Sequence, residues 1–398
     1  MVSIEGDNMK NIKNVLITIL LVLLTFTCNI YSVKAMTDDN IDNDYESIDI
    51  LEEDSIDISL DEVNISIPLK VSARNAIAID AESNQVLWNQ NAYEIVPMAS
   101  TTKILTALIA INYGDLDRKV IISKNASSIR GSTVGYSAGE EITMRELLFG
   151  LMFRSGNDAA IAIAEDIGGS IEGFSNIMND FAKNVGIIDS HFESPHGLDS
   201  SKHYSSAYDL AILTSKAMEY SVFRECVGEK VIYKDKYNFT RDYQNINKIL
   251  YKIPEANGVK TGYTGGAGKC LVSSINHNGK NIIIVVLNCV DRWNVTEKIY
   301  NYVVKSNEFI NKNNKTILQE EKLAGLGKII NEEDLSYGYK ESDIVEVEVF
   351  KPILDIEVGN ILGKISVKDT GKEKNKFPLI SNININKEEL EKIILGEK

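Results

Sequence analysis

The sequence PMASTTKILTAL, residues 97–108, decides how this chain is organised. Apolar residues recur at helical spacing from Ile104 onward, so the stretch predicts a buried helix whose first turn lies near Ser100. Ser100 and Lys103 are three positions apart and therefore share a face of that helix. A serine becomes a nucleophile when a base takes its proton, and a lysine can be that base if its surroundings lower its pKa. The pair therefore indicates a nucleophilic serine at a helix N-terminus.

Two further polar motifs lie downstream of this pair. Ser155-Gly156-Asn157 stands between helical patterns at 144–154 and 158–167, and Lys260-Thr261-Gly262 precedes a pair of alternating strands. Each motif alone is weak: a capping serine, a plain turn and a solvent-facing strand end would explain them as well. Their order and their contexts, a helix start, an interhelical turn and a strand edge, carry the argument.

Composition bounds the class of protein. The chain has 398 residues, 44% of them apolar, which is enough for two ordinary domains with a real core. Its net charge of −15 argues against a nucleic-acid partner. The four cysteines, Cys28, Cys226, Cys270 and Cys289, form no C-x-x-C pair. We therefore expect the three in the body of the chain to be buried as small hydrophobes.

The first 68 residues predict an export signal and a linker. In residues 1–35, two lysines precede an apolar run at 15–28, and Ala35 offers a small-residue cleavage site. An uncleaved anchor is the alternative, although the run is short for a membrane span. Residues 36–68 are strongly acidic: 37–69 contain twelve Asp or Glu and no Lys or Arg. This composition predicts a disordered acidic linker.

The remainder predicts an α+β domain and a small β domain. Strand patterns at 73–81 and 85–88 precede the helices, and strands at 269–275 and 281–289 follow them, which suggests an antiparallel sheet with a helical cluster over 69–312. A long helix is expected at 293–310. After a polar break at 311–315 the apolar period changes to two, at 344–349, 354–358 and 364–367. We expect a β domain over 313–384 and a short helical tail over 385–398.

Three of the four histidines, His191, His196 and His203, fall within thirteen residues. Their spacings put no two of them one helical turn apart, and Pro195 and Gly197 make the segment a loop. No metal site is predicted there. Ser205 is expected to cap the next helix, at 206–219.

These motifs resemble those of the superfamily that contains class A β-lactamases and penicillin-binding proteins. The resemblance is strongest to D-alanyl-D-alanine carboxypeptidases of the low-molecular-weight penicillin-binding protein 5 type, and it runs from about residue 70 to the end. It implies a β-lactamase/transpeptidase-like domain followed by a small all-β domain. The matching stretches are ASTTK at 99–103, SGNDAA at 155–160, PHGL at 195–198, HYS at 203–205, KTGYT at 260–264 and VGNILGKI at 358–365.

The resemblance implies a serine-type carboxypeptidase that removes the terminal D-alanine from peptidoglycan stem peptides outside the cytoplasmic membrane, with no cofactor and no metal. β-Lactam antibiotics would acylate the same serine. By this resemblance Ser100 attacks the carbonyl, Lys103 takes the Ser100 proton, and Ser155 relays a proton to the leaving D-alanine. Asn157 positions Lys103 and the substrate amide. Lys260 and Thr261 hold the terminal carboxylate, the N–H groups of Ser100 and Tyr263 form the oxyanion hole, and Gly262 is a further substrate-binding residue.

Two competing functions remain open at this point. A class A β-lactamase would need a glutamate in a Glu-x-x-x-Asn setting, and the one such spacing between the second and third motifs is Glu172 to Asn176, on a helix that we expect to be solvated. A non-catalytic penicillin-sensing or wall-binding relative would keep the fold without turnover. The tail departs from the family, because its glutamates outnumber its basic residues. An interfacial helix should be basic, so a membrane anchor in the tail is not expected.

Overall fold

The computed structural model describes residues 69–82, 84, 86–305, 344–349, 356–358, 361–381 and 383–395. The expected export signal, the acidic linker and the boundary at 312 lie outside these residues. In the ranges that the structure does describe, no helix is long and apolar enough to cross a membrane.

A five-stranded antiparallel sheet forms the frame, in the order β2-β1-β9-β8-β7. Two strands precede the helices in the sequence and three follow them. The strand patterns predicted four of these five strands, whereas β7 was expected only as a strand edge at Lys260-Thr261-Gly262. The central pairing joins β1 to β9, with Asn75 opposite Leu287. The strands are β1 (Asn75–Asp80), β2 (Val86–Gln90), β7 (Ala256–Thr264), β8 (Gly268–His277) and β9 (Lys280–Leu287).

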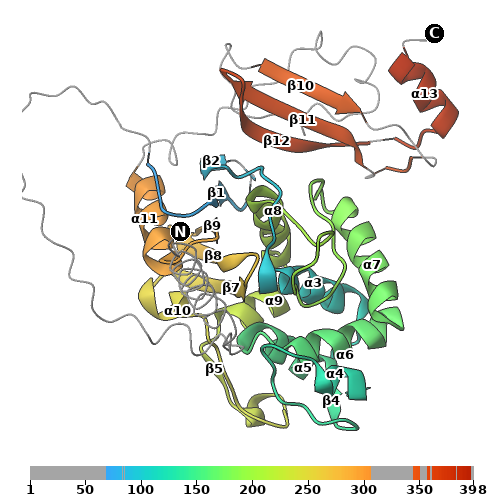
Figure 1. Ribbon diagram of the computed structural model, residues 1–398, viewed down its shortest axis with the longest axis vertical. Helices are drawn as coiled ribbons and strands as arrows, with labels where there is room; N and C mark the ends of the chain where they lie inside the picture. The colour runs from blue at the N-terminus through green and yellow to red at the C-terminus, as the bar shows by residue number, and fades with distance from the viewer. Residues whose placement is uncertain are drawn as a thin grey trace, which may run out of the picture. The chain divides into compact units, whose positions relative to one another are not determined.

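The sheet is covered on both faces, which explains the nearly continuous apolar sequence of β9. Ile283 and Val285 pack in the same apolar core as the helical cluster, whereas Ile282 and Ile284 pack with residues of α11 (Arg292–Lys305) on the other side. Figure 1 shows the sheet between α11 and the helical cluster. The α+β class expected from the sequence is confirmed. Residues 306–310 of the expected last helix lie outside the described part.

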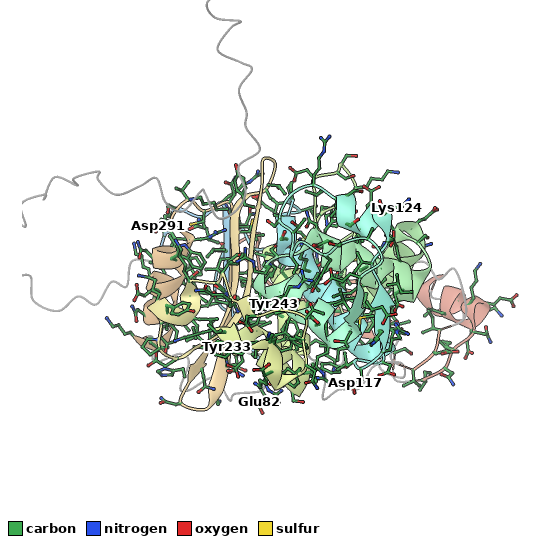
Figure 2. All side chains as sticks on the ribbon, turned by 90° about the horizontal axis from the view of Figure 1, so that it is seen from below. Glu82, Asp117, Lys124, Tyr233, Tyr243 and Asp291 are labelled. Atoms are coloured by element: carbon green, nitrogen blue, oxygen red, sulfur yellow. The ribbon has the colours of Figure 1, made fainter. Side chains whose placement is uncertain are left out.

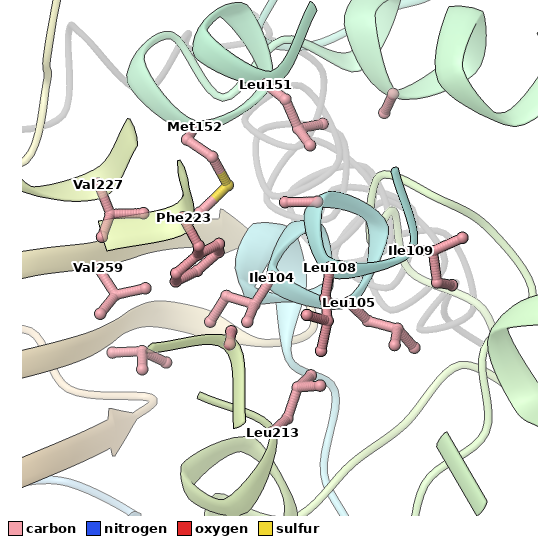
Figure 3. Packing of buried hydrophobic residues seen from close by; sticks show 14 of the residues in the cluster. Ile104, Leu105, Leu108, Ile109, Leu151, Met152, Leu213, Phe223, Val227 and Val259 are labelled. Carbon is pink, nitrogen blue, oxygen red and sulfur yellow. The ribbon is translucent and has the colours of Figure 1, made fainter. Parts of the chain in front are cut away.

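Helix α3 (Lys103–Tyr113) forms the centre of the helical cluster. Its first eight residues are buried, and Figure 3 shows Ile104, Leu105 and Leu108 among side chains from α5, α8, α9 and β7. Burying an aliphatic side chain of this size contributes about 1.5–3 kcal/mol. The other helices are α4 (Lys124–Ser128), α5 (Met144–Phe153), α6 (Asn157–Gly168), α7 (Ile171–Asn184), α8 (Ala207–Met218), α9 (Ser221–Gly228) and α10 (Ile249–Lys252).

Small elements complete this domain. Two short hairpins pair β3 (Lys119–Ile121) with β4 (Glu141–Thr143) and β5 (Val231–Ile232) with β6 (Tyr243–Gln244). The second hairpin, its 3₁₀ turn η2 (Lys234–Lys236), α9 and α10 were not predicted, because each is too short to show a clear apolar period. Figure 2 shows Tyr243 inside the domain, while Asp117 and Lys124 lie on its surface.

The expected cap of α8 was wrong by one residue. Ser206 is the N-cap, and its Oγ accepts a hydrogen bond from the Asp209 N–H at 3.0 Å. The Ser205 hydroxyl instead contacts Ser190 Oγ at 2.7 Å, and the Ser205 backbone pairs with Val96. Ser205 therefore ties the chain just before the 97–108 stretch to the start of α8. Cys226, Cys270 and Cys289 are buried and free, as expected.

The C-terminal part forms a three-stranded antiparallel sheet, β10 (Ile344–Val349), β11 (Ile361–Asp369) and β12 (Lys372–Ile380). The strand expected at 354–358 was wrong where the structure describes it, because Ile356 makes only an isolated bridge to Ile385. The third strand is β12, whose lysines hid its pattern. The expected tail helix is α13 (Lys387–Leu395), and its Leu390 is fully buried.

Candidate active site

Lys103 joins the first motif to two other parts of the chain. Ser100 lies in a 3₁₀ turn, η1 (Ala99–Thr102), that leads directly into α3. The Lys103 Nζ donates to Ser100 Oγ at 2.8 Å, to Asn157 Oδ1 at 2.8 Å and to the His196 carbonyl oxygen at 2.9 Å. The lysine is completely buried. Its three N–H groups therefore have three acceptors in a dry setting.

Lys260 and Ser155 form a second polar pair. The Lys260 Nζ donates to Ser155 Oγ at 3.0 Å and to the Thr261 carbonyl oxygen at 2.7 Å. Both residues are buried, and Ser155 has a φ of +57°, in the left-handed region that few non-glycine residues adopt. Such backbone persists only where the surroundings hold it, and functional sites are a common place for it.

Asn157 is the first residue of α6, and its amide has a defined orientation. Its Nδ2 donates to the Arg130 carbonyl oxygen at 2.7 Å, which leaves Oδ1 to accept from Lys103. Its backbone N–H donates to the Ser132 carbonyl oxygen at 2.8 Å. A segment distant in sequence therefore orients the second motif.

Strand β7 passes directly over the start of the first helix. A Cβ on Gly262 would lie 3.0 Å from the Ser100 nitrogen and 3.2 Å from the Thr101 nitrogen, so a larger residue would push the strand and the turn apart by a few tenths of an ångström. β7 is an edge strand, and its Tyr263 is 39% exposed. Arg292, buried at the start of α11, donates to the Gly262 carbonyl oxygen at 3.0 Å. Arg292 thus ties the edge strand β7 to the N-terminus of α11.

The 191–203 loop packs against the same turn. Its Pro195 carbonyl accepts from Thr106 Oγ1 at 2.7 Å, and the Gly197 backbone, at φ +87°, lies so close that a Cβ would be 2.0 Å from the Ala99 carbonyl oxygen. These contacts place the His196 carbonyl against Lys103. The loop therefore contributes to the site through its backbone.

The buried histidines of this loop are scaffold groups in the structure. His203 Nδ1 accepts from the Glu193 N–H at 3.0 Å, so the ring proton lies on Nε2, 2.8 Å from Thr102 Oγ1. Burial lowers the pKa of His203 to about 4. Burial and the nearby Lys103 lower the pKa of His196 to about 3. In the described part of the chain no group of three or more His, Cys, Asp or Glu side chains could hold a metal ion.

The structure brings five predicted site residues into two hydrogen-bonded sets. Ser100, Lys103 and Asn157 form one set, and Ser155 and Lys260 form the other. Gly262 packs against the Ser100 amide, and the Thr261 carbonyl accepts a hydrogen bond from Lys260. Tyr263 is the next residue of β7 and is partly exposed.

Sequence reasoning missed Asp158, Arg292 and the carbonyl oxygens of Arg130 and His196. Asp158 had a signal, since it is an acid in the first turn of a helix. A carbonyl contact leaves no mark on residue type.

Comparison with known proteins identifies the family. Residues 61–291 match the peptidase family described as D-alanyl-D-alanine carboxypeptidase. The chain is 38% identical over 223 residues to the D-alanyl-D-alanine carboxypeptidase DacF of Bacillus subtilis, covering 54% of this chain and 57% of that protein. It is 35% identical over 246 residues to DacC of Escherichia coli, covering 58% of this chain and 60% of the relative. The aligned stretch thus spans less than two thirds of either relative's length.

A solved structure supports the same assignment. A mutant of a Streptomyces DD-transpeptidase is 31% identical, with a TM-score of 0.56, and the match covers 59% of this chain and 99% of that one. The family model matches more than half of the sequence, and the solved structure shares the fold of the matched part. This chain therefore belongs to the D-alanyl-D-alanine carboxypeptidase family of peptidases.

Proposed function

We propose that the protein is a serine-type D-alanyl-D-alanine carboxypeptidase that removes the terminal D-alanine from peptidoglycan stem pentapeptides and is acylated by penicillin at Ser100. The observation that carries this proposal is the donor set of Lys103, which links the nucleophile to Asn157 and to the His196 carbonyl. Membership of the family supports the reaction type.

The contacts of Lys103 suit a general base. A neutral amine has two N–H groups and one lone pair. If it keeps its bonds to Asn157 Oδ1 and the His196 carbonyl, the lone pair is directed at the Ser100 hydroxyl, 2.8 Å away. Lys103 then takes the hydroxyl proton as Ser100 Oγ attacks the carbonyl carbon between the two D-alanines, forming an ester and releasing the amine.

Ser155 and Lys260 supply the proton that the leaving amine needs. Ser155 Oγ accepts from Lys260, so its own hydroxyl proton is free to point at the departing nitrogen. Lys260 then replaces that proton. In the second step water attacks the ester, its proton passes through Ser155 to Lys260, and the proton held by Lys103 returns to Ser100 Oγ, so all four groups regain their starting states.

Substrate recognition follows from the remaining site residues. The Lys260 cation and the Thr261 hydroxyl suit a free terminal carboxylate. The Ser100 amide lies beneath Gly262, so the N–H groups of Ser100 and Tyr263 would both face a carbonyl oxygen placed at the edge of β7. Each oxyanion-hole donor contributes about 3–4 kcal/mol to the transition state in comparable enzymes.

The proposal includes a domain organisation and a location. Residues 1–35 serve as an export signal, 36–68 as a linker, 69–312 as the catalytic domain, 313–384 as the β domain and 385–398 as its helical tail. Peptidoglycan lies outside the cytoplasmic membrane, so the protein must be exported to reach its substrate. The location is the cell wall or the outer face of that membrane.

The β-lactamase alternative has little structural support. Glu172 and Asn176 both lie exposed on α7, in the solvated positions expected from the sequence, and neither takes part in the hydrogen-bonded sets around Ser100. In the carboxypeptidase proposal, Lys103 and Lys260 with their serine partners therefore activate the hydrolytic water, and no glutamate takes part.

Intact mass over time after mixing the full-length protein with benzylpenicillin tests this proposal. We expect one penicilloyl adduct on the wild type, lost slowly, and none on Ser100→Ala. The wild type should also release D-alanine from a stem pentapeptide. An unmodified wild type with intact penicillin would refute the catalytic proposal, and rapid destruction of penicillin without D-alanine release would indicate a β-lactamase.

A further inference from the structure

The 130–136 loop, between α4 and β4, forms one wall of the site. Its hydrogen bonds to Asn157 come from backbone groups: the Arg130 carbonyl accepts from the Asn157 side chain, and the Ser132 carbonyl accepts from the Asn157 N–H. The loop has no regular helix or strand of its own. Its shape must therefore be imposed by neighbouring groups.

Asp158 is the group that imposes this shape. It is 1% exposed, and its carboxylate accepts from the N–H groups of Val134 at 3.0 Å, Gly135 at 2.8 Å and Tyr136 at 3.2 Å. It also accepts from the Ala159 N–H at 2.9 Å. Successive N–H groups that converge on one anion form a nest, which fixes the backbone that carries them. Asp158 is adjacent in sequence to Asn157, so the same helical turn holds the loop and receives its contacts.

The loop in turn decides which way the Asn157 amide faces. The Arg130 carbonyl can accept only from the NH₂ end, and this contact turns Oδ1 toward the Lys103 Nζ. If the loop withdrew, the amide could rotate by half a turn and present its NH₂ to the lysine. The site would then lose the hydrogen bond that Oδ1 accepts from Lys103, which becomes charged when it takes the Ser100 proton.

We propose that Asp158 is a positioning residue of the reaction: its carboxylate shapes the 130–136 loop, and the Arg130 carbonyl of that loop orients the Asn157 amide toward Lys103. This inference rests on the proposed function only for the role of Lys103 as the base. Asp158 itself touches no reacting atom.

Two glycines provide a matched test. Gly131 has a φ of +94°, and a Cβ there would lie 2.7 Å from Asn157 Nδ2. Gly139 has a φ of +84° and no heavy atom within 4 Å of the added Cβ. Alanine at either position meets the same unfavourable backbone region. Only at 131 does it also push against the Asn157 amide.

The first experiment compares acylation rates of full-length protein with a fluorescent penicillin. We expect Gly131→Ala and Asp158→Asn to be about tenfold slower or more than wild type, the loss of one charge-assisted hydrogen bond, and Gly139→Ala to stay within about threefold. Equal slowing in the two glycine variants, or no slowing in Gly131→Ala, overturns the step from the loop to Asn157, and an Asp158→Asn protein that reacts at the wild-type rate overturns the role of Asp158. If Asp158→Asn does not fold, Asp158→Glu, which keeps the charge but moves the carboxylate, takes its place, and a wild-type rate overturns the proposal in the same way.

A second measurement reports the orientation itself. In protein labelled with ¹⁵N at asparagine, the side-chain NH₂ signal of Asn157 is assigned by its absence from Asn157→Ala. We expect that signal to move in Gly131→Ala and in folded Asp158→Asn, and to stay in Gly139→Ala. A signal that is unmoved in the first two overturns the proposal. The NH₂ signal of Asn157 can be measured without any turnover. A wild type that fails to react with penicillin would therefore refute the proposed function and leave the role of Asp158 open to this measurement.

Discussion

The 191–203 loop contacts Lys103 directly and the 130–136 loop acts on it through Asn157, and the chain holds the two loops by opposite means. A buried carboxylate, Asp158, gathers the N–H groups of the first loop. The second loop is held by buried imidazoles, and the pKa values of His196 and His203 are lowered to about 3 and about 4. The second loop places its own carbonyl on the lysine, where a second cation would be repelled. The neutral histidines His196 and His203 therefore suit the second loop, whereas the charged Asp158 carboxylate suits the first.

Gly197→Ala should have the largest effect, on the second loop. A Cβ at φ +87° would lie 2.0 Å from the Ala99 carbonyl oxygen and 2.7 Å from Thr102 Oγ1. We expect a loss of at least about 3 kcal/mol of unfolding free energy, from backbone strain and overpacking together. Urea unfolding measures it. Gly279→Ala is the control, because Gly279 has φ +85° and open space; an equal loss in both would show that strain alone matters.

Glu146→Gln tests the support behind the first loop. The Glu146 carboxylate is 1% exposed and accepts from the Thr240 N–H at 2.9 Å and from Tyr243 OH at 2.8 Å, and Tyr243 contacts Tyr136 at 2.8 Å. The amide would bring donors against donors, at a cost of about 1–3 kcal/mol in unfolding free energy. We expect penicillin acylation of the folded protein to fall less than in Gly131→Ala. A larger fall would mean that this network, and not Asp158, positions the loop.

His203→Gln should change how stability depends on pH. Above about pH 6.5 the histidine is neutral in the folded and the unfolded chain. As the pH falls below about 6.5, His203 becomes protonated in the unfolded chain, whereas in the folded protein it stays neutral down to about pH 4. The free energy of unfolding therefore decreases between these two pH values. At pH 5 the loss from this residue is about 2 kcal/mol.

Urea unfolding at pH 7 and pH 5 checks this prediction. The wild type should lose about 2 kcal/mol more than the variant between the two conditions, whatever the variant's stability at pH 7. Because His203 is one of the groups that lower the pKa of His196, its replacement also reduces the loss through His196, which changes the difference in the same direction. The same pH dependence in both would show that His203 is not kept neutral by burial.

Asp199→Asn should have the smallest effect. This exposed carboxylate accepts from Thr264 Oγ1 at 2.6 Å and from the Gly266 N–H at 2.8 Å, which joins the second loop to the end of β7. Solvent competes for both bonds, so we expect a change below about 1 kcal/mol in unfolding free energy. Acylation by penicillin should stay within about twofold. A tenfold loss of acylation rate would mean that the two Asp199 hydrogen bonds, rather than the Gly197 contact, place the His196 carbonyl.

Much of the fold was predictable because it depends on repeated side-chain patterns. The helical spacing after Ile104 marked α3, and the apolar run of β9 and the alternation of β10 marked buried and half-buried strands. Where the pattern was short or polar, prediction failed. β12 was missed because lysines alternate along it, and the β5–β6 hairpin because its strands have two residues each.

The sequence by itself determined which chemical groups are available: a serine and a lysine on one helical turn, a serine and an asparagine at the next helix start, and a lysine on a strand edge. Only the tertiary structure decided how they are used. It placed Lys260 on Ser155, closed β7 over the Ser100 amide, and gave Lys103 the His196 carbonyl and Asn157 the Arg130 carbonyl. Every residue has a backbone carbonyl, so residue type cannot reveal these contacts; they arise where one loop packs against the buried Lys103 and another against Asn157.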